Sequence, residues 1–484
     1  MDSIERQIRA LQSELVRLRR DAATRDAEAR TAREDARQAR AEAHDVQRRF
    51  DAARPPPQAA RQPGPPVAEE VRLGFPNGRP TISSGDGRFQ AFLGGQIQYD
   101  VGGAVRGAAG TPNNRGVQDL DAFGQNLRRG RLFFGFKYDD VQVNLTPDFG
   151  GSPDGTPTLY EANFNWSPVR PLTLTLGYFK PWITLQDSMS SNDFLMLERP
   201  SIAEIARNVA GGDARSSLGG RWAAERWFAA AYLTGDAYGS NNTAQATRGQ
   251  TGFVGRVAGR AYADADTDVH LGFSGSYAFD LRRQANGQTL QLRDRPELRI
   301  DQQRLIDTGG ISADSAFTWG PEFGVRWRNL LLQGEYIRIG VDQSRAGAAP
   351  HPDLAFEGGY VEGSWVITGE PRRYSAAAAA FTRPNPARSF TFQEANAGAW
   401  EVAARYSVAD LNDAVVRGRS QTSTGGVFGG RQEVVGTSLS WYPNNYLRFV
   451  LNWNIVNVDR QNPAGTTQIG QRFHTIALRT QLAF

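Results

Sequence analysis

Apolar and polar residues alternate along most of the chain, from Arg88 to the C-terminal end. In the segment 171–180, three leucines and a tyrosine share one face, while two threonines and a glycine share the other. A period of two residues with one apolar face is the pattern of a half-buried β-strand. Sixteen such segments occur, at 88–100, 127–138, 139–147, 157–167, 171–180, 214–224, 226–235, 250–263, 268–279, 317–328, 330–339, 354–367, 398–409, 432–442, 446–458 and 472–484.

The connections between these segments alternate in length. The short ones are 139–140, 168–170, 225 and 443–445, and the long ones include 101–126, 181–213 and 280–316. Short turns on one side and long loops on the other are typical of an outer-membrane β-barrel. The polar phase of the strands holds Gln, Asn, Ser, Thr and Arg, which is too polar for a packed core. The pattern therefore predicts an all-β fold, a sixteen-stranded antiparallel transmembrane β-barrel with a water-filled lumen.

Aromatic residues on the apolar phase stand at the ends of several segments, at Tyr138, Trp166, Tyr178, Trp327 and Trp441. Such girdles mark the two interfaces between a membrane and water. The last segment ends in Phe484 on the apolar phase, and this ending resembles the signal read by the outer-membrane insertion machinery. These features favour a membrane barrel over a soluble β-sandwich.

The N-terminal part has a different pattern. Apolar positions recur with alternating spacings of four and three from Ile4 to Phe50, interrupted at Arg25. This heptad repeat predicts a self-associating coiled coil, and a single solvated helix is the alternative. Residues 54–66 read RPPPQAARQPGPP, a semi-rigid spacer. We expect three parts: a coiled-coil stalk at 1–53, a Pro-rich linker leading into the barrel at 54–87, and the barrel at 88–484.

Composition narrows the chemistry that the chain can carry. The absence of cysteine excludes disulfides and thiolate sites, and the four histidines are scattered. No nucleophile elbow is found, and no phosphate-binding loop lies between a strand and a helix. We therefore expect no catalytic residue, no metal site and no cofactor. Acids match the arginines of the N-terminal helix, so no nucleic-acid partner is expected.

Seven segments resemble the phosphate-selective porin O and P family. They are LRRGRLFFGFKY (127–138), LTLTLGYFKPW (172–182), FLMLERPSIAEI (194–205), RPELRIDQQRLIDTGG (295–310), YVEGSWVITGEPRRY (360–374), GAWEVAARYS (398–407) and LSWYPNNYLRFVLNW (439–453). The resemblance runs from about residue 88 to the end of the chain. It implies a sixteen-stranded barrel, usually a homotrimer, with an arginine-lined anion path and a narrow constriction. Some members carry a periplasmic coiled coil ahead of the barrel.

The chain departs from this family in its lysines. Phosphate-selective members rely on lysines at the pore mouth as well as on lumen arginines, whereas this chain has only Lys137 and Lys180. Biased codon usage explains an excess of arginine, but guanidinium groups also suit oxyanions better than ammonium groups do. The resemblance therefore leaves open a phosphate channel and a general, weakly anion-selective porin.

Strict alternation assigns the side chains that face the lumen. In the segment 127–138 the bulky apolar residues face lipid, which leaves Arg129, Arg131 and Lys137 inside. The same rule places further arginines inside, namely Arg88, Arg215, Arg221, Arg256, Arg260, Arg326, Arg405, Arg448 and Arg479. The lumen acids include Asp100, Glu161, Glu322, Glu335 and Glu401. Basic residues outnumber acids, and a positive lumen admits anions. Pairing of single arginines with lumen acids is the alternative, with Arg326 and Glu322 as its strongest candidate.

The segment 181–213 is too long for a tight turn. We expect a helix between Asp193 and Asn208, with its apolar side chains buried, namely Leu195, Leu197, Ile202 and Ile205. The segment caps the barrel outside or folds into the lumen as a constriction, and the second is favoured. In that case Arg199 and Arg207 face the path, and Glu198 and Glu204 anchor the loop to arginines of the wall.

These patterns predict a porin of the bacterial outer membrane with its stalk in the periplasm. Its expected partners are small anionic solutes, phosphate or other oxyanions among them, together with outer-membrane lipid and lipopolysaccharide. A homotrimer is expected, as is contact between the coiled coil and the cell wall. The alternative function is an outer-membrane anchor whose coiled coil tethers the membrane to the cell wall.

Overall fold

The computed structural model describes residues 70–105, 123–150, 156–238, 249–281, 290–344, 351–416 and 418–484. The predicted coiled coil and the proline-rich spacer lie outside these residues. In the parts of the chain that are described, no helix combines the length and the hydrophobicity needed to cross a membrane.

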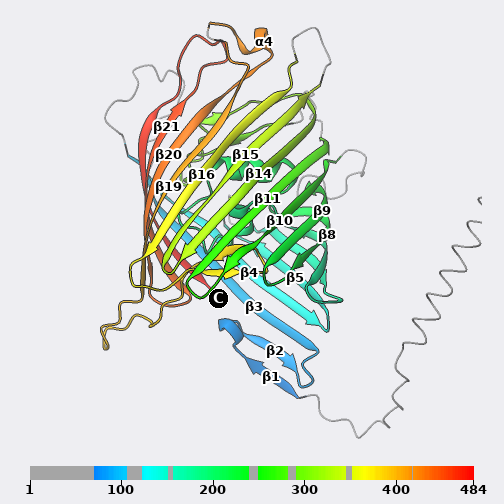
Figure 1. Ribbon diagram of the computed structural model, residues 1–484, viewed down its shortest axis with the longest axis vertical. Coiled ribbons are helices and arrows are strands. Elements are labelled where there is room, and N and C mark those ends of the chain that lie inside the picture. The colour runs from blue at the N-terminus through cyan, green and yellow to red at the C-terminus, as the bar shows by residue number, and fades with distance from the viewer. Residues whose placement is uncertain are drawn as a thin grey trace, which may run out of the picture. The chain divides into compact units, whose positions relative to one another are not determined.

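Sixteen antiparallel strands close into a barrel in the described chain (Figure 1). They are β3 (Phe89–Val105), β4 (Phe123–Tyr138), β5 (Val141–Asp148), β6 (Thr158–Trp166), β7 (Leu172–Phe179), β8 (Arg215–Ala223), β9 (Trp227–Ala237), β10 (Thr251–Ala263), β11 (Thr267–Asp280), β14 (Ala313–Trp327), β15 (Leu330–Gln343), β16 (Leu354–Val366), β19 (Ala399–Asp413), β20 (Val427–Tyr442), β21 (Leu447–Asp459) and β22 (Arg472–Ala483). The last strand pairs with the first, from His474 opposite Val105 to Ala483 opposite Gln96. Each predicted segment corresponds to one of these strands.

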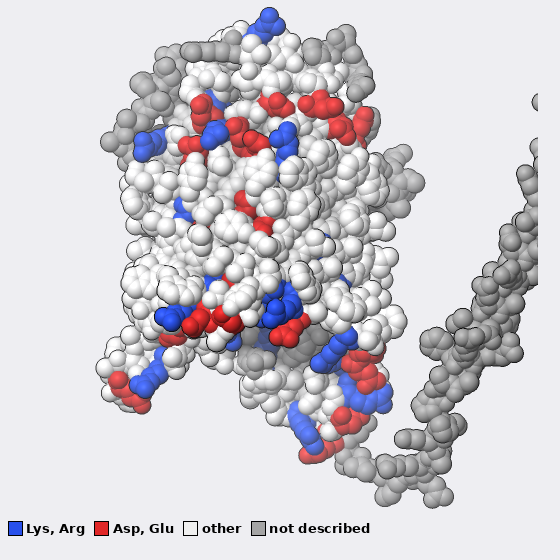
Figure 2. All heavy atoms as spheres, in the orientation of Figure 1, with Lys and Arg blue, Asp and Glu red and all other residues white. Residues whose placement is uncertain are grey.

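The two faces of each strand differ as the alternation predicts. In β4, Leu132 and Phe136 are exposed by 41% and 47%, whereas Arg129 and Arg131 are buried. The aromatic residues Tyr138, Trp166 and Trp327 are exposed on the outer surface at strand ends. Figure 2 shows charged side chains gathered toward the two ends of the barrel, with a mostly uncharged band between them. This outer surface matches a membrane-spanning wall.

A small hairpin precedes the barrel in the region assigned to the linker. It consists of β1 (Val71–Gly74), the 3-10 turn Pro76–Gly78 and β2 (Thr81–Ser84). The strand β2 pairs with the start of β3, with Thr81 opposite Phe92. The sequence did not predict this hairpin, because its strands are shorter than the alternation that was sought.

One connection breaks the expected separation of short turns and long loops. Six connections at the end where β4 and β22 finish are short, and we call this the short-turn end. The connection 367–398 lies at the same end but is long and carries β17 (Arg373–Ser375) and β18 (Ala380–Thr382). The expectation that all long connections lie on one side is therefore wrong at this position.

The loop 180–214 folds into the barrel. It carries α2 (Leu185–Ser188) and α3 (Ser201–Ala210), and α3 contacts β10, β11, β14, β15, β16 and β19. The expected helix start at Asp193 is wrong, because α3 begins only after Pro200. A proline disfavours helical backbone at the residue before it, here Arg199. The four apolar side chains expected to be buried in this loop are all at most 3% exposed.

The interior also contains a packed apolar core, contrary to the expectation of a uniformly polar lumen. Ile202, Ile205 and Val209 of α3 pack in one cluster with wall residues such as Ile337 and Phe356. The loop 281–312, which carries β12 (Arg293–Asp294) and β13 (Ile306–Asp307), adds Leu305, Ile306 and Ile311 to this cluster. On this part of the wall the inward phase is apolar, because it faces a helix rather than water. The remaining helix, α4 (Gln421–Thr424), lies in an outer loop.

Candidate functional site

Glu198 fastens the loop 180–214 to the barrel wall. Its carboxylate lies 2.6 Å from Nε of Arg128 on β4 and 2.9 Å from Nη2 of Arg479 on β22. Arg299 of the loop 281–312 approaches it to 3.4 Å. Burial opposes ionisation of Glu198, but the neighbouring Arg128 and Arg479 more than offset this and hold its pKa well below the usual value. Glu198 therefore joins two loops and two strands as a carboxylate.

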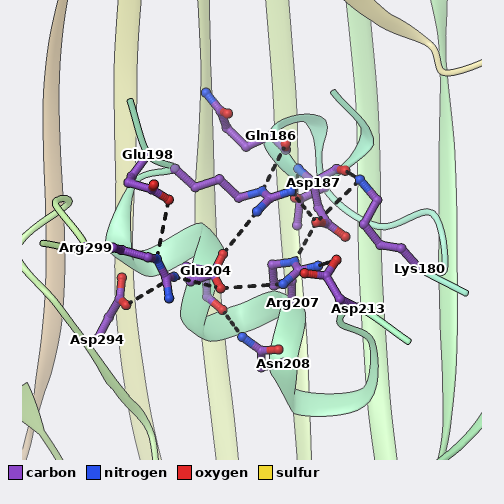
Figure 3. A network of polar contacts seen from close by, with 12 residues as sticks. Lys180, Gln186, Asp187, Glu198, Glu204, Arg207, Asn208, Asp213, Asp294 and Arg299 are labelled. Carbon is purple, nitrogen blue, oxygen red and sulfur yellow. Dashed lines mark hydrogen bonds and ion pairs between the residues drawn. The ribbon is translucent and has the colours of Figure 1, made fainter. Parts of the chain in front are cut away.

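A second cluster of charges lies within the loop itself (Figure 3). Arg207 is fully buried and donates to Asp187 Oδ1 at 2.5 Å and to Asp213 Oδ1 at 2.6 Å. Arg199 lies 3.2 Å from Asp187 and 3.3 Å from Glu204, and Glu204 also binds Arg207 and Arg299. With carboxylates on several sides, Arg207 holds the loop in shape and does not reach open space.

Lys180 stands at the edge of this cluster, directly after β7. Its ammonium group donates to the backbone oxygen of Asp187 and lies 3.9 Å from that residue's carboxylate. Burial lowers the pKa of Lys180 to about 8, against the opposing attraction of Asp187. Lys180 is therefore a cation whose charge changes near neutral pH.

The loop 281–312 supports α3 from its N-terminal end. Glu297 accepts hydrogen bonds from the backbone N–H of Ser201 at 3.1 Å and from Ser407 Oγ at 2.6 Å. The same carboxylate pairs with Arg405 of the wall. A carboxylate at a helix N-terminus is favoured by the unpaired N–H groups and the helix dipole. The sequence analysis did not predict that this loop folds inward, although its apolar residues indicate that it is buried.

The connection 367–398 enters the barrel from the short-turn end and meets the loop 180–214. Arg372 binds Glu401 of β19 at 2.6 Å and donates to the backbone oxygen of Asp193 at 2.8 Å. On the same connection, Phe381 packs with Leu195 and neighbouring side chains. Two segments from opposite ends of the barrel therefore interlock inside it.

Several wall arginines hold these segments in place. Arg256 donates to the backbone oxygens of Ala378 and Ala379 and lies 2.6 Å from Glu322. Arg405 donates to the backbone oxygen of Glu198 at 2.9 Å, and Arg479 binds Asp100 at 2.6 Å. These three guanidinium groups are almost completely buried.

Two further wall arginines each donate to a backbone oxygen of the loop 180–214 and to a neighbouring strand. Arg215 donates to Gly211 O at 2.7 Å and to Gly235 O at 3.0 Å. Arg448 donates to Ser440 Oγ at 2.9 Å and to Asn192 O at 3.2 Å. Both are thus buried supports of the loop structure.

The expected pairing of Arg326 with Glu322 is wrong. Arg326 binds Asp268 at 2.6 Å, and Arg260 binds the same carboxylate. Residues four apart on one strand are separated by about 13 Å, whereas Asp268 stands directly opposite Arg326 on the neighbouring strand. Glu322 instead accepts from Arg256 and lies 3.0 Å from His270 Nε2.

A cavity of about 690 Å³ remains open between the loops and the wall. Arg129 and Arg131 of β4 line it, together with Lys180 and Arg199 of the loop. Three further arginines line it from outside the barrel strands, namely Arg79, Arg373 and Arg383. The acidic side chains in the lining are Asp193 and Asp213.

Arg129 and Arg131 are held differently within this lining. Arg131 lies 2.7 Å from Asp148 and 3.5 Å from the centre of the Tyr160 ring. Arg129 donates to Gln98 at 2.6 Å, and its Nε has no partner among the described residues. Arg129 therefore keeps a guanidinium donor that no carboxylate of the described chain occupies.

A second cavity, of about 700 Å³, runs along the wall from β5 to β8. It shares lining residues with the first, among them Tyr160, Lys180 and Asp193. Arg221 lines this second cavity with its guanidinium group 5.0 Å from the centre of the Trp182 ring. The two cavities are thus neighbours on one side of the barrel.

The remaining predicted residues lie away from these cavities. Lys137 is half-buried near the short-turn end of β4. Arg88 is half-exposed at that end and binds Asp139 at 2.6 Å, so its assignment to the lumen is wrong. Arg88 precedes the first strand residue, Phe89, and strand alternation does not extend to it.

Alternation also missed Arg128, which points to Glu198. The register between β3 and β4 shifts here, since Gln98 faces Arg129 and Tyr99 faces Leu127. Arg128 is the extra residue of this bulge, and a bulge turns a side chain away from the regular phase.

Comparison with known proteins places these observations in a family. A family model described as phosphate-selective porin O and P matches residues 92–484. A Caulobacter vibrioides protein described as uncharacterized is 26% identical over 91% of this chain and 87% of its own length. Porin O of Pseudomonas aeruginosa is 23% identical over 76% of this chain and 83% of its own length. An anion-selective porin from Comamonas acidovorans aligns with a TM-score of 0.46 at 12% identity, over 82% of this chain and all of that one.

Proposed function

The chain belongs to the phosphate-selective porin O and P family, and we propose that it is an anion-preferring diffusion channel for small anionic solutes. Family membership and the closed barrel support a porin of the outer membrane and point to a channel rather than an enzyme. The preference for anions goes beyond family membership, and we infer it from the charged side chains around the open cavity.

The lining of the first cavity is the observation that carries the proposal. Seven basic side chains line it, against two acidic ones. Arg131 is paired with Asp148, and Lys180 and Arg199 lie near Asp187, while the acid Asp213 is bound to Arg207 at 2.6 Å. The lining stays positive, because four of its arginines form no ion pair among the described residues, namely Arg79, Arg129, Arg373 and Arg383. A narrow space with an excess of fixed positive charge raises the local concentration of anions and repels cations. Arg129 adds to this charge without an ion pair of its own, and its buried Nε has no hydrogen-bond partner among the described residues.

The pore-lining role falls to the residues around the cavities, namely Arg129, Arg131, Lys180, Arg199 and Arg221. The buried arginines of the wall have a supporting role, because loop carboxylates and carbonyls already occupy them. Small oxyanions such as phosphate are the preferred solutes, since the planar guanidinium fork binds two oxygens at once.

The test is the reversal potential of the purified channel in a planar bilayer under a KCl gradient. We expect a sign that indicates chloride permeation over potassium. The preference falls with salt, because the Debye length shrinks from about 10 Å at 0.1 M to about 3 Å at 1 M. Added phosphate reduces the chloride current. A potential that indicates cation preference would overturn the proposal.

We propose a homotrimer, which the family resemblance implies. The outer surface of β16 to β22 carries a shallow groove lined by small residues such as Gly363, Ala404 and Thr437, flanked by Trp365 and Trp453. Small side chains allow close approach of neighbouring walls in a membrane. The rest of the wall contacts lipid and lipopolysaccharide. Mass measurement in mild detergent checks this, and monomers alone would refute it.

The predicted coiled coil remains a proposed periplasmic stalk that contacts the cell wall. Removal of residues 1–66 separates this role from the channel. We expect the truncated protein to keep its conductance and to lose attachment to isolated cell walls. Equal attachment of both proteins would exclude a tether built on these residues.

A further inference from the structure

The second cavity has a wall that the proposed anion path does not explain. Its surface between β5 and β7 is rich in amides and hydroxyls and carries one acid, Glu161. We call this surface the polar ladder, formed by Gln142, Asn144, Asn163, Asn165, Thr173 and Thr175. Bare inorganic anions need positive charge, which the ladder lacks.

The ladder is a continuous chain of side-chain hydrogen bonds across three strands. Gln142 donates to Asn144 at 2.7 Å, and Asn144 donates to Asn163 at 3.1 Å. Asn165 donates to the same oxygen of Asn163 at 2.5 Å, and Thr175 donates to Asn165 at 2.9 Å. These contacts fix the amide orientations before any solute arrives, which lowers the entropy lost on binding.

The ladder still has hydrogen-bonding capacity to spare. A side-chain amide offers two N–H donors and two acceptor lone pairs. Within the described chain, the bonds above use about half of this capacity at Asn144 and Asn165. Both side chains are half-buried and line the cavity. The hydroxyl groups of a solute can both donate hydrogen bonds to the free amide oxygens and accept hydrogen bonds from the free amide N–H groups.

An acidic group stands at one end of the ladder and a cationic group at the other. At the first end, Glu161 accepts hydrogen bonds from Thr146 and Asn163. Arg131 lies beyond it, paired with Asp148, and lines the first cavity. At the other end, Arg221 stands directly opposite Thr173 on the neighbouring strand. No carboxylate of the described residues pairs with Arg221, which contacts the Trp182 ring.

Aromatic side chains also line the cavity. Tyr160, Phe179 and Trp182 line it, and an aromatic face packs against the apolar C–H face of a sugar ring. The cavity thus brings together a free cation, a row of neutral hydrogen-bonding groups and flat apolar surfaces. A polyhydroxylated phosphate ester carries the complement of all three.

We propose that the polar ladder, with Arg221 at one end, is a binding site for sugar or polyol phosphates on the permeation path. This inference rests on the proposed anion channel and names the organic solutes that the channel favours. The phosphate group binds a guanidinium, and the hydroxyl groups bind the ladder. At the low end of their usual strength, two or three net hydrogen bonds correspond to on the order of tenfold in affinity.

The experiment is the block of chloride current in the full-length channel by matched solutes. Glucose 6-phosphate, n-butyl phosphate and inorganic phosphate share the phosphate charge but differ in hydroxyl groups, and glucose carries hydroxyls without charge. We expect half-block by glucose 6-phosphate at about a tenfold lower concentration than by n-butyl phosphate. Equal half-block by these two esters in the unaltered channel overturns the inference.

Two variants test whether the ladder makes this difference. In the variant Asn144→Leu/Asn165→Leu, we expect the ratio of the two half-blocking concentrations to fall from about ten to about one. Thr173→Val/Thr175→Val removes two hydroxyls with little change in side-chain size, and we expect it to lower the ratio about threefold. This second variant keeps the test valid if the first variant does not fold. Asn457→Leu, on the outer face of β21, is the control. An unchanged ratio in either folded ladder variant refutes the site.

Failure of the inference and failure of the proposed function give different results. A reversal potential without anion preference refutes the channel proposal, whatever the block shows. A clear anion preference with equal block by both phosphate esters refutes only the ladder site.

Discussion

The inner surface of β5 to β7 and the part of β15 to β20 that faces α3 have opposite character although they belong to one barrel. The first carries mainly amides and hydroxyls and borders open space. The second carries residues such as Ile337, Phe356 and Val434 in one cluster with α3. The polarity of the inward-facing residues of a strand therefore depends on what those residues contact inside the barrel. A barrel wall becomes apolar inside where a loop fills the lumen and stays polar where water and solutes pass.

The largest expected effect comes from placing a carboxylate in the filled half. Ile205→Asp puts an unpaired charge into the core between α3 and the wall, and we expect a loss of about 3–5 kcal/mol of stability. The same new charge on the open wall, in Asn165→Asp, costs less than about 1 kcal/mol because water reaches it. Thermal unfolding followed by circular dichroism compares the two. Equal losses would mean that the two walls do not differ in this way.

Next in size is the release of the loop 180–214 from the wall. Glu198→Gln removes the charge that binds Arg128 and Arg479, and a cost of about 2–3 kcal/mol is expected. The loosened loop should raise single-channel conductance and its noise. Glu357→Gln is the control, since it also removes a carboxylate that pairs with an arginine, but at an exposed position away from the loop. If Glu198→Gln has unchanged single-channel conductance and unchanged current noise, other contacts suffice to hold the loop.

A smaller effect is expected from the cavity arginines. Arg129→Gln/Arg131→Gln should lower the permeability ratio of anions to cations about fivefold, equivalent to about 1 kcal/mol. Arg338→Gln/Arg431→Gln removes the same net charge from exposed positions and serves as the control. Reversal potentials in a salt gradient provide the measurement. If both double variants shift the potential equally, overall charge rather than the cavity sets the preference.

The smallest effect is the pH dependence that Lys180 confers. Its pKa of about 8 lies below the usual lysine value, so the ammonium is charged below pH 8 and neutral above it. Anion preference should decline between pH 7 and pH 9, as the charged fraction falls from about nine-tenths to about one-tenth. Lys180→Arg keeps its charge over this range and should flatten the decline. A decline of the same size in Lys180→Arg would assign it to another group, with Asp294 and its pKa of about 7 as the first candidate.

The sequence predicted the wall better than its contents. A period of two located all sixteen strands, because lipid on one side imposes a regular pattern on every strand. The pattern also placed Arg129 and Arg131 on the buried face of β4. It failed at Arg128, where a bulge changes the phase, and at Arg326, whose partner depends on the register between two strands. Neither a bulge nor a register is visible in the residues of a single strand.

The interior segments were harder to predict, because their packing depends on contacts between distant parts of the chain. The helix α3 was expected, but Pro200 moved its start. The connection 367–398 was not recognised as an inward segment, because strand alternation does not tell where a connection folds. Apolar residues in a connection, such as Leu305 and Ile306, are the signal that was available. Loops that stay in water have no reason to carry them.

The interlocked segments inside the barrel also constrain the order of folding. Arg479 and Glu198 are 281 residues apart in the chain, and Arg372 and Asp193 are 179 apart. Contacts between distant residues form slowly, because the intervening chain must first be brought together. The strands supply that proximity when the cylinder closes. We therefore expect insertion into the membrane to precede packing of the interior, so that a newly closed barrel is briefly a wider and less selective pore than the finished one.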